Sequence, residues 1–210
     1  MRDAGEPLAP DATPDAGSVL VVDGAALQRE PGPDGAVTAS VTGPAGVLAW
    51  VAPPRGGRAA VQADGSATLQ DDTGAVVAAL GPPSAADGGR GTWRVAGEVL
   101  ALDAVGGAAS FVVGTAALAS ATWGEAEGGR SLAVVPADWV RGGSLAAQQA
   151  LSSQLQAAEP EAASSSMQAQ LWCHVLGAPD KASWNLEPWR PDVGTGTMLA
   201  TRCNPTDADL

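Results

Sequence analysis

Short runs of Val, Ala and Leu, separated by Gly, Pro and Asp, fill the first two thirds of the chain. This pattern is typical of short strands and tight turns, because β-branched residues favour extended backbone and Gly or Asp adopt turn conformations. Asp64–Gly65 is a tight-hairpin signal, and Gly97 marks another hairpin. The regular spacing predicts an antiparallel, meander or sandwich-like β-domain over residues 18–143. Its expected strands are Val19–Val22, Val37–Val41, Val47–Val51, Ala60–Gln62, Ala67–Gln70, Ala75–Leu80, Thr92–Val95, Val99–Asp103, Phe111–Val113, Ala117–Thr122 and Leu132–Val135.

The pattern changes after Gly143, where helix-forming residues replace the turns. The segment SLAAQQALSSQLQAA, residues 144–158, carries an N-cap candidate in Ser144 and predicts a helix that ends before Pro160. We therefore assign residues 144–160 to a connecting helix and linker. The fold class expected for the whole chain is mainly β, and α+β overall.

Residues 161–210 are expected to form a small β-rich C-terminal module. Leu171–Val175 and Thr197–Cys203 are the predicted strands, and Ser183–Leu186 is predicted to be extended. Cys173 and Cys203 would then lie on neighbouring strands. In an oxidising compartment these two cysteines would form the disulfide that closes the module, whereas in a reducing cytosol they would stay thiols.

The start of the chain is rich in Pro, Ala, Asp and Ser, and residues 1–17 are expected to be a disordered spacer. Residues 1–18 lack the apolar stretch of a signal peptide. Because such a spacer commonly follows a cleaved signal, we expect a secreted or cell-surface protein whose export signal is absent from this chain. No run approaches the roughly 20 apolar residues of a membrane span, so the chain is not expected to cross a membrane.

The formal net charge is −12, with 23 acidic and 11 basic residues. An acidic surface repels phosphate backbones, so nucleic acid is not an expected partner. The composition, poor in Lys, Phe and Tyr, is typical of a GC-rich, actinobacterial genome. Glycine-rich phosphate loops, nucleophile elbows and His-Glu-x-x-His motifs are absent from the sequence, and no cofactor is expected. The sequence specifies no oligomeric state.

Tryptophans concentrate near the end of the chain in the string KASWNLEPWRPD, where Trp184 and Trp189 flank Glu187 and precede Arg190. One interpretation is a ligand-binding groove, in which indole faces stack on a sugar or cation and the charged groups make directed bonds. The other is a small core stabilised by buried Trp and an internal ion pair, as small modules require. Both interpretations use the same residues.

His174 is the single histidine of the chain. It lacks the His or thiolate companions of a zinc site, so no metal site is expected. With Glu187 and Arg190 it could form an acid–base pair and an anion clamp, as in a small hydrolase. The favoured interpretation is that His174 is structural or merely exposed, because residues of these types occur together in many proteins without forming a site.

A longer motif spans Met167–Pro205. It comprises Trp172–Val175, Gly177–Pro179, Lys181, Ser183–Pro191 and Cys203–Pro205. This motif resembles the family called domain of unknown function 2599, which occurs at the C-termini of secreted bacterial, mostly actinobacterial, proteins. The resemblance implies export and the disulfide, and it implies no activity.

Two functional hypotheses remain at this point. The first is a non-enzymatic binding or structural module that contacts a glycan or protein of the cell envelope. The second is a secreted antibacterial effector whose C-terminal module is a small hydrolase using His174 and Glu187. A binding module predicts Trp184 or Trp189 exposed beside a groove, and an enzyme predicts His174 hydrogen-bonded to a carboxylate in a pocket.

Overall fold

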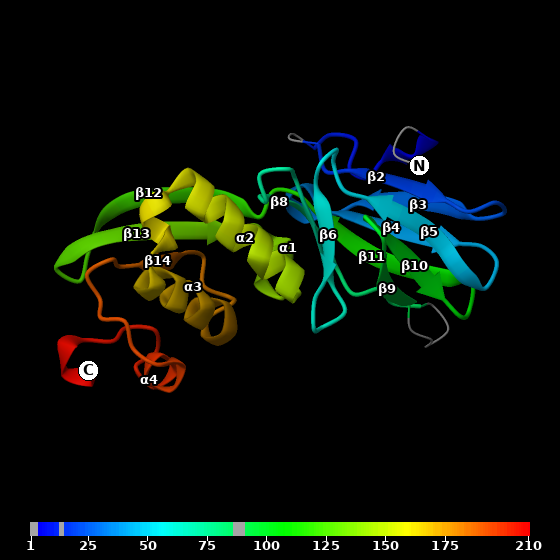
Figure 1. Cartoon of the computed structure of the whole chain (residues 1–210). Helices are drawn as coiled ribbons and strands as arrows, with labels where there is room; N and C mark the ends of the chain where they lie inside the picture. Colours follow the sequence, from blue (N-terminus) through cyan, green and yellow to red (C-terminus); the bar gives the residue numbers. More distant parts are fainter. Residues whose placement is uncertain (1–3, 13–14, 86–90) are drawn as a thin grey trace. The chain divides into compact units, whose positions relative to one another are not determined.

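The computed structural model describes residues 4–12, 15–85 and 91–210 and shows a mainly β protein with antiparallel sheets, as predicted (Figure 1). The chain divides into two compact units. The N-terminal unit comprises Met1–Ala117 and Gly143–Ala150, and the C-terminal unit comprises Leu118–Gly142 and Leu151–Leu210.

The N-terminal unit contains two antiparallel sheets. In the first sheet the strand order is β1 (Glu6–Pro7), β2 (Ser18–Val21), β5 (Gly46–Ala52), β10 (Val99–Ala104) and β9 (Gly91–Ala96). In the second it is β3 (Ala26–Pro31), β4 (Val37–Thr42), β11 (Ala108–Gly114), β8 (Val76–Leu80), β7 (Ala67–Gln70) and β6 (Arg58–Val61), with a short turn of helix, η2 (Pro33–Gly35), between β3 and β4.

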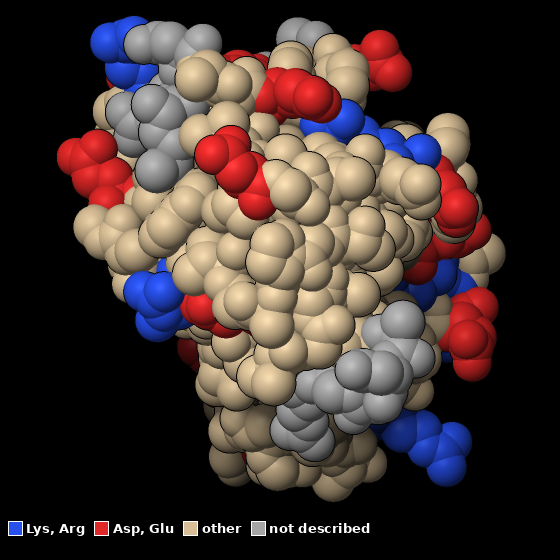
Figure 2. All heavy atoms as spheres, turned by 90° about the vertical axis from the view of Figure 1, so that its right-hand side faces the viewer, with Lys and Arg blue, Asp and Glu red and all other residues tan. Residues whose placement is uncertain are grey.

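One apolar core joins the two sheets of this unit, as expected of a sandwich. Leu48 and Leu100 come from the first sheet, and Leu69 and Phe111 come from the second. Trp93 packs edge-to-face on Phe111 with ring centroids 4.7 Å apart. On the molecular face shown in Figure 2, uncharged side chains cover the centre and charged side chains of both signs lie mainly around the edge.

The start of the chain differs from the expected disordered spacer. Residues 1–3 and 13–14 lie outside the described residues, but Glu6 pairs with Val19 in the first sheet, and the Leu8 side chain is buried in the core. The Leu8 N–H also donates to the Gly17 carbonyl at 2.9 Å. The composition of this segment is mostly polar, but the single side chain of Leu8 buries enough apolar surface to anchor it.

The C-terminal unit is built on a sheet with the order β12 (Leu118–Ala126), β13 (Gly129–Pro136) and β14 (Trp184–Leu186). Glu127 and Gly128 connect the first two strands and both have positive φ, at 54° and 87°. This is the backbone of a type I′ hairpin, which matches the twist of the strands it joins.

Helices complete this unit (Figure 1). The predicted connecting helix is confirmed as α2 (Leu145–Ala158), of which the residues after Ala150 belong to the C-terminal unit. The remaining helices are α1 (Asp138–Arg141), η3 (Pro160–Ala163), α3 (Ser165–Gly177), α4 (Thr195–Ala200) and η4 (Asp207–Asp209).

Two strands predicted for residues 161–210 are wrong. Leu171–Val175 lies inside α3, and Thr197–Cys203 starts inside α4 and continues past its end at Ala200. Buried Met167, Leu171 and Val175 recur every fourth residue, which is a helical period that the short apolar run alone does not reveal. The extended segment predicted at Ser183–Leu186 is confirmed as β14.

The boundary between the units also differs from the expected one. The β12–β13 hairpin was assigned to the β-domain over residues 18–143, but it forms the sheet of the C-terminal unit. The cause is the pairing of β13 with β14, in which Leu132 lies opposite Leu186 and Val134 lies opposite Trp184. A pairing between segments this far apart along the chain leaves no local sequence signal.

Candidate functional site

The sheet of the C-terminal unit has one core face and one open face. Leu132, Val134, Trp184 and Leu186 have fully buried side chains and lie on the core face. Thr122, Ala133 and Asn185 are direct cross-strand partners, so they share the other face. Trp184, predicted to contact a ligand, is therefore a core residue, and that prediction is wrong.

The outer edge of β14 is covered by side chains of α3. The Gln170 amide donates to the Glu187 carbonyl at 2.9 Å and accepts from the Glu187 N–H at 2.9 Å. One helical turn later, His174 Nε2 donates to the Asn185 carbonyl at 3.1 Å. Alternate residues of a strand present backbone groups to the same edge, and residues four apart on a helix are neighbours, so the two spacings match.

His174 is buried, and its position differs from that of a general base. Burial lowers its pKa, the bond to the Asn185 carbonyl raises it, and the nearby charge of Lys181 lowers it, with an overall decrease. Because a carbonyl only accepts, Nε2 carries the proton, and Nδ1 has no hydrogen-bond partner among the described residues. The structure thus gives His174 a backbone partner and does not pair it with Glu187.

Glu187 and Arg190 form a buried ion pair, with the residues 1% and 4% exposed. Arg190 Nε donates to Glu187 Oε2 at 2.9 Å, and the Ser131 hydroxyl donates to Glu187 Oε1 at 3.0 Å. Arg190 also donates to the Pro205 carbonyl at 3.0 Å and pairs with Glu127 at the hairpin turn. These two predicted ligand-binding residues are therefore engaged within the protein.

Trp189 is 43% exposed, yet several contacts hold it in place. Its Nε1 donates to the Arg130 carbonyl at 3.1 Å, and the guanidinium carbon of Arg190 lies 4.6 Å from the ring centroid. A Cβ atom at Gly129 would lie 2.3 Å from Trp189 Nε1, so only glycine accommodates the indole there. Gly129 pairs with Ala126, which places Trp189 over the hairpin end of the open face.

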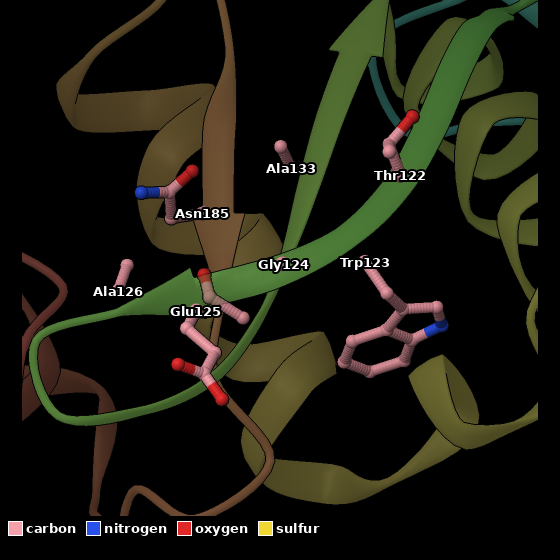
Figure 3. A pocket seen from close by; sticks show the side chains of 8 residues that line it. Thr122, Trp123, Gly124, Glu125, Ala126, Ala133 and Asn185 are labelled. Atoms are coloured by element: carbon pink, nitrogen blue, oxygen red, sulfur yellow. The ribbon is translucent and has the colours of Figure 1, made fainter.

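The same face is hollowed beyond Ser131. The depression has a volume of about 250 Å³ and is lined by Thr122, Trp123, Gly124, Glu125, Ala126, Ser131, Ala133 and Asn185. In Figure 3, Thr122, Ala133 and Asn185 point to one side of the sheet, and Trp123 and Glu125 point to the other. Gly124 has no side chain and Ala133 carries only a methyl group, so little fills the depression at these two positions. We call this depression the open-face groove; Trp189 is not among its lining residues and lies beside it, over Gly129.

The predicted disulfide between Cys173 and Cys203 is confirmed, with a Cα–Cα distance of 5.5 Å. It joins α3 to the segment after α4 rather than two strands. Buried Met198 packs against both cysteines, and Ala169 and Val193 pack around them. The bond fixes the backbone two residues before Pro205, whose carbonyl accepts from Arg190.

Sequence reasoning missed several residues that build this site. Ser131, Glu127 and Gly129 lie on the hairpin, and Thr122 and Asn185 lie on the two outer strands. The alternation Trp184–Asn185–Leu186 carries a period-two signal that could have placed Asn185 opposite the buried tryptophan. No signal in the sequence joins the hairpin to the tail.

Over residues 4–12, 15–85 and 91–210, no group of three or more His, Cys, Asp or Glu could hold a metal ion. Within the same residues, no helix has the length and apolar character needed to cross a membrane.

A small sheet with helices on its core face, a disulfide and an internal ion network define this unit as a compact α+β domain. Residues 118–206 match the sequence model of the family described as "Protein of unknown function (DUF2599)". The match confirms the resemblance seen in the tail motif. The family region starts at β12, well before Met167, where the motif begins.

Uncharacterized proteins of Mycobacterium tuberculosis (strain H37Rv) and Mycobacterium bovis (strain AF2122/97) are each 46% identical to the chain over 65 residues. Each match covers 29% of this chain and 44% of the relative, so the chain spans less than half the length of the curated relatives it matches. No solved structure matches the chain.

Proposed function

We propose that the C-terminal unit is a non-enzymatic binding module that contacts a glycan of the cell envelope through the open-face groove and the adjacent Trp189. The observation that carries this proposal is Trp189, which is exposed and yet fixed by a hydrogen bond, a buried guanidinium and a glycine floor. An immobilised indole loses little conformational entropy when a ligand stacks on it. Aromatic faces of this kind suit the apolar side of a sugar ring.

The polar lining of the groove supports a neutral, hydroxyl-rich ligand. The Thr122 hydroxyl and the Asn185 amide have no side-chain hydrogen-bond partner among the residues that the structure describes, and both groups donate and accept. They lie across Ala133 on the open face, beyond the Ser131–Glu187–Arg190 network. A few polar groups beside an aromatic surface are typical of small-molecule sites.

Secretion is part of the proposal and rests on the disulfide. Disulfides persist in oxidising compartments and are rare in the cytosol. The hydrolase alternative finds no support in this arrangement, because the partner of His174 Nε2 is a backbone carbonyl and Glu187 is neutralised by Arg190.

A pull-down on a mycobacterial envelope fraction tests the proposal. One portion of the fraction is stripped of protein with protease and another is treated with glycan hydrolases. We expect the wild-type chain to be retained by the first and lost from the second. Trp189→Ala should reduce retention at least about 10-fold, since aromatic contacts of this kind contribute on the order of 1.5 kcal/mol. Trp172→Ala is the matched control, because Trp172 is also 43% exposed.

A second variant separates ligand contact from folding. A Cβ atom at Gly124 would meet nothing within 4 Å, so the backbone accepts a side chain there, and Gly124→Gln places one in the groove. We expect Gly124→Gln to unfold at the wild-type temperature and to lose retention. Undiminished retention of this folded variant would refute the groove as the glycan site.

A further inference from the structure

The two edges of the sheet in the C-terminal unit differ in whether side chains cover their backbone groups. Along β14, side chains of α3 cover the Asn185 carbonyl and both backbone groups of Glu187. The opposite edge belongs to β12, a strand of nine residues that pairs with β13 on one side only. An uncovered strand edge is a row of unpaired N–H and C=O groups, and proteins usually protect such edges.

The register shows which backbone groups of β12 are unpaired. Asn185 and Glu187 face outward on β14, so Leu186 bonds inward to Leu132, and Ala133 on β13 must face β12. Ala133 lies opposite Thr122. Thr122 and its alternate neighbours therefore bond to β13, and the residues between them, Ala121, Trp123 and Glu125, direct their N–H and C=O groups away from the sheet.

These outward groups lack protection in the part of the chain that the structure describes. The Gln154 side chain accepts from the Leu118 N–H at 3.2 Å, and no hydrogen bond covers the outward backbone of Ala121, Trp123 or Glu125 among the described residues. The strand contains no Pro or Lys, the residues that commonly block an edge, and Glu125 is its single charge.

We propose that β12 pairs antiparallel with β12 of a second copy of this chain. An antiparallel edge is self-complementary, because each residue of a hydrogen-bonded pair both donates and accepts. Centred on Trp123, the pairing sets Ala121 of each copy opposite Glu125 of the other, so the one charged residue does not face its counterpart. The union of the two sheets buries little beyond the strands themselves, and the dimer is therefore weak and concentration-dependent.

Sedimentation velocity of the full chain, from micromolar to near-millimolar concentration, tests this dimer. Ala121→Pro removes an outward N–H that the sheet does not use, and Pro is tolerated at such edge positions. Ala121→Val is the matched control, because it keeps the N–H and favours strand. We expect the wild type and Ala121→Val to dimerise alike, with stronger association at higher salt because the net charge of −12 repels at low salt. Ala121→Pro should dimerise at least about 10-fold more weakly. The proline removes one hydrogen bond between the two β12 strands and prevents neighbouring ones from forming in register.

A second measurement keeps the test decisive if Ala121→Pro unfolds the unit. Amide hydrogen exchange of the wild type at Ala121, Trp123 and Glu125 should slow as the concentration rises, with unchanged exchange on β13. A wild type that stays monomeric at the highest concentration would overturn the proposal. So would a dimer in which these three amides exchange as fast as in the monomer.

Discussion

Replacing Arg190 by Met should destabilise the C-terminal unit by about 3–5 kcal/mol, the cost of breaking a buried ion pair. The side chains of Arg190 and Glu187 are each 2% exposed, so water cannot replace the lost partner. The substitution leaves the Glu187 carboxylate with the Ser131 hydroxyl as its remaining side-chain partner and frees the Pro205 carbonyl. Glu127 contributes little to this loss, because it is exposed and becomes solvated.

Urea unfolding followed by tryptophan fluorescence and by far-UV circular dichroism measures this loss. The two units are analysed as separate transitions, since a two-state treatment of the whole chain does not apply. Arg94→Ala is the control, because its bridge to Asp103 is exposed and should contribute at most about 1 kcal/mol. A loss below about 1 kcal/mol for Arg190→Met would refute the reasoning.

A second substitution isolates the charge. In the Arg190→Met background, Glu187→Gln keeps an acceptor for the Ser131 hydroxyl but removes the uncompensated negative charge. This double variant should regain on the order of 1–2 kcal/mol relative to Arg190→Met alone. No recovery would mean that the loss comes from packing around Trp189 instead of from the buried carboxylate.

Three further predictions concern the same unit. Replacing Cys173 and Cys203 by Ser should lower its stability by about 3–4 kcal/mol, measured by thermal unfolding with and without reductant, because the bond closes a separation of 30 residues. The pKa of His174 is lowered in the folded state, so its contribution to stability is present above its unfolded pKa of roughly 6.5 and is lost as the pH falls through the folded-state value. The free energy of unfolding, measured at pH 7.5 and 5.5, should therefore depend less on pH for His174→Gln than for the wild type. Gly129→Ala should displace Trp189, which a shifted indole Nε1–H resonance would report, and an unchanged resonance would contradict the packing described here.

The sandwich and the connecting helix could be predicted because their signals are local. Turn residues such as Asp64–Gly65 fix hairpins from neighbouring positions, and Ser144 begins a run of helix formers. The helix around Cys173 was missed because Leu171–Val175, taken alone, fits a strand as well as a helix. The tail strand finds its partner on β13 through long-range packing, and no local residue specifies that choice.

The candidate site, like the fold, could be predicted only in part. The sequence identified Trp189, Glu187 and Arg190 as a chemically unusual group, and the structure brings them together. It could not separate exposed Trp189 from buried Trp184, because both are tryptophans in one short string. The distinction arises from which face of the sheet each reaches, and that depends on the β13–β14 register.

The Pro205 carbonyl that accepts from Arg190 has a consequence for the order of events during synthesis. The hairpin beginning at Leu118 leaves the ribosome first, but its open-face network is incomplete until residues 203–205 follow. The β12–β13 hairpin therefore stays unfinished until the last residues of the unit have been made. Closure of the unit thus waits for the same short segment that carries Cys203, so the disulfide and the last hydrogen bonds of the ion network form together at the end of folding.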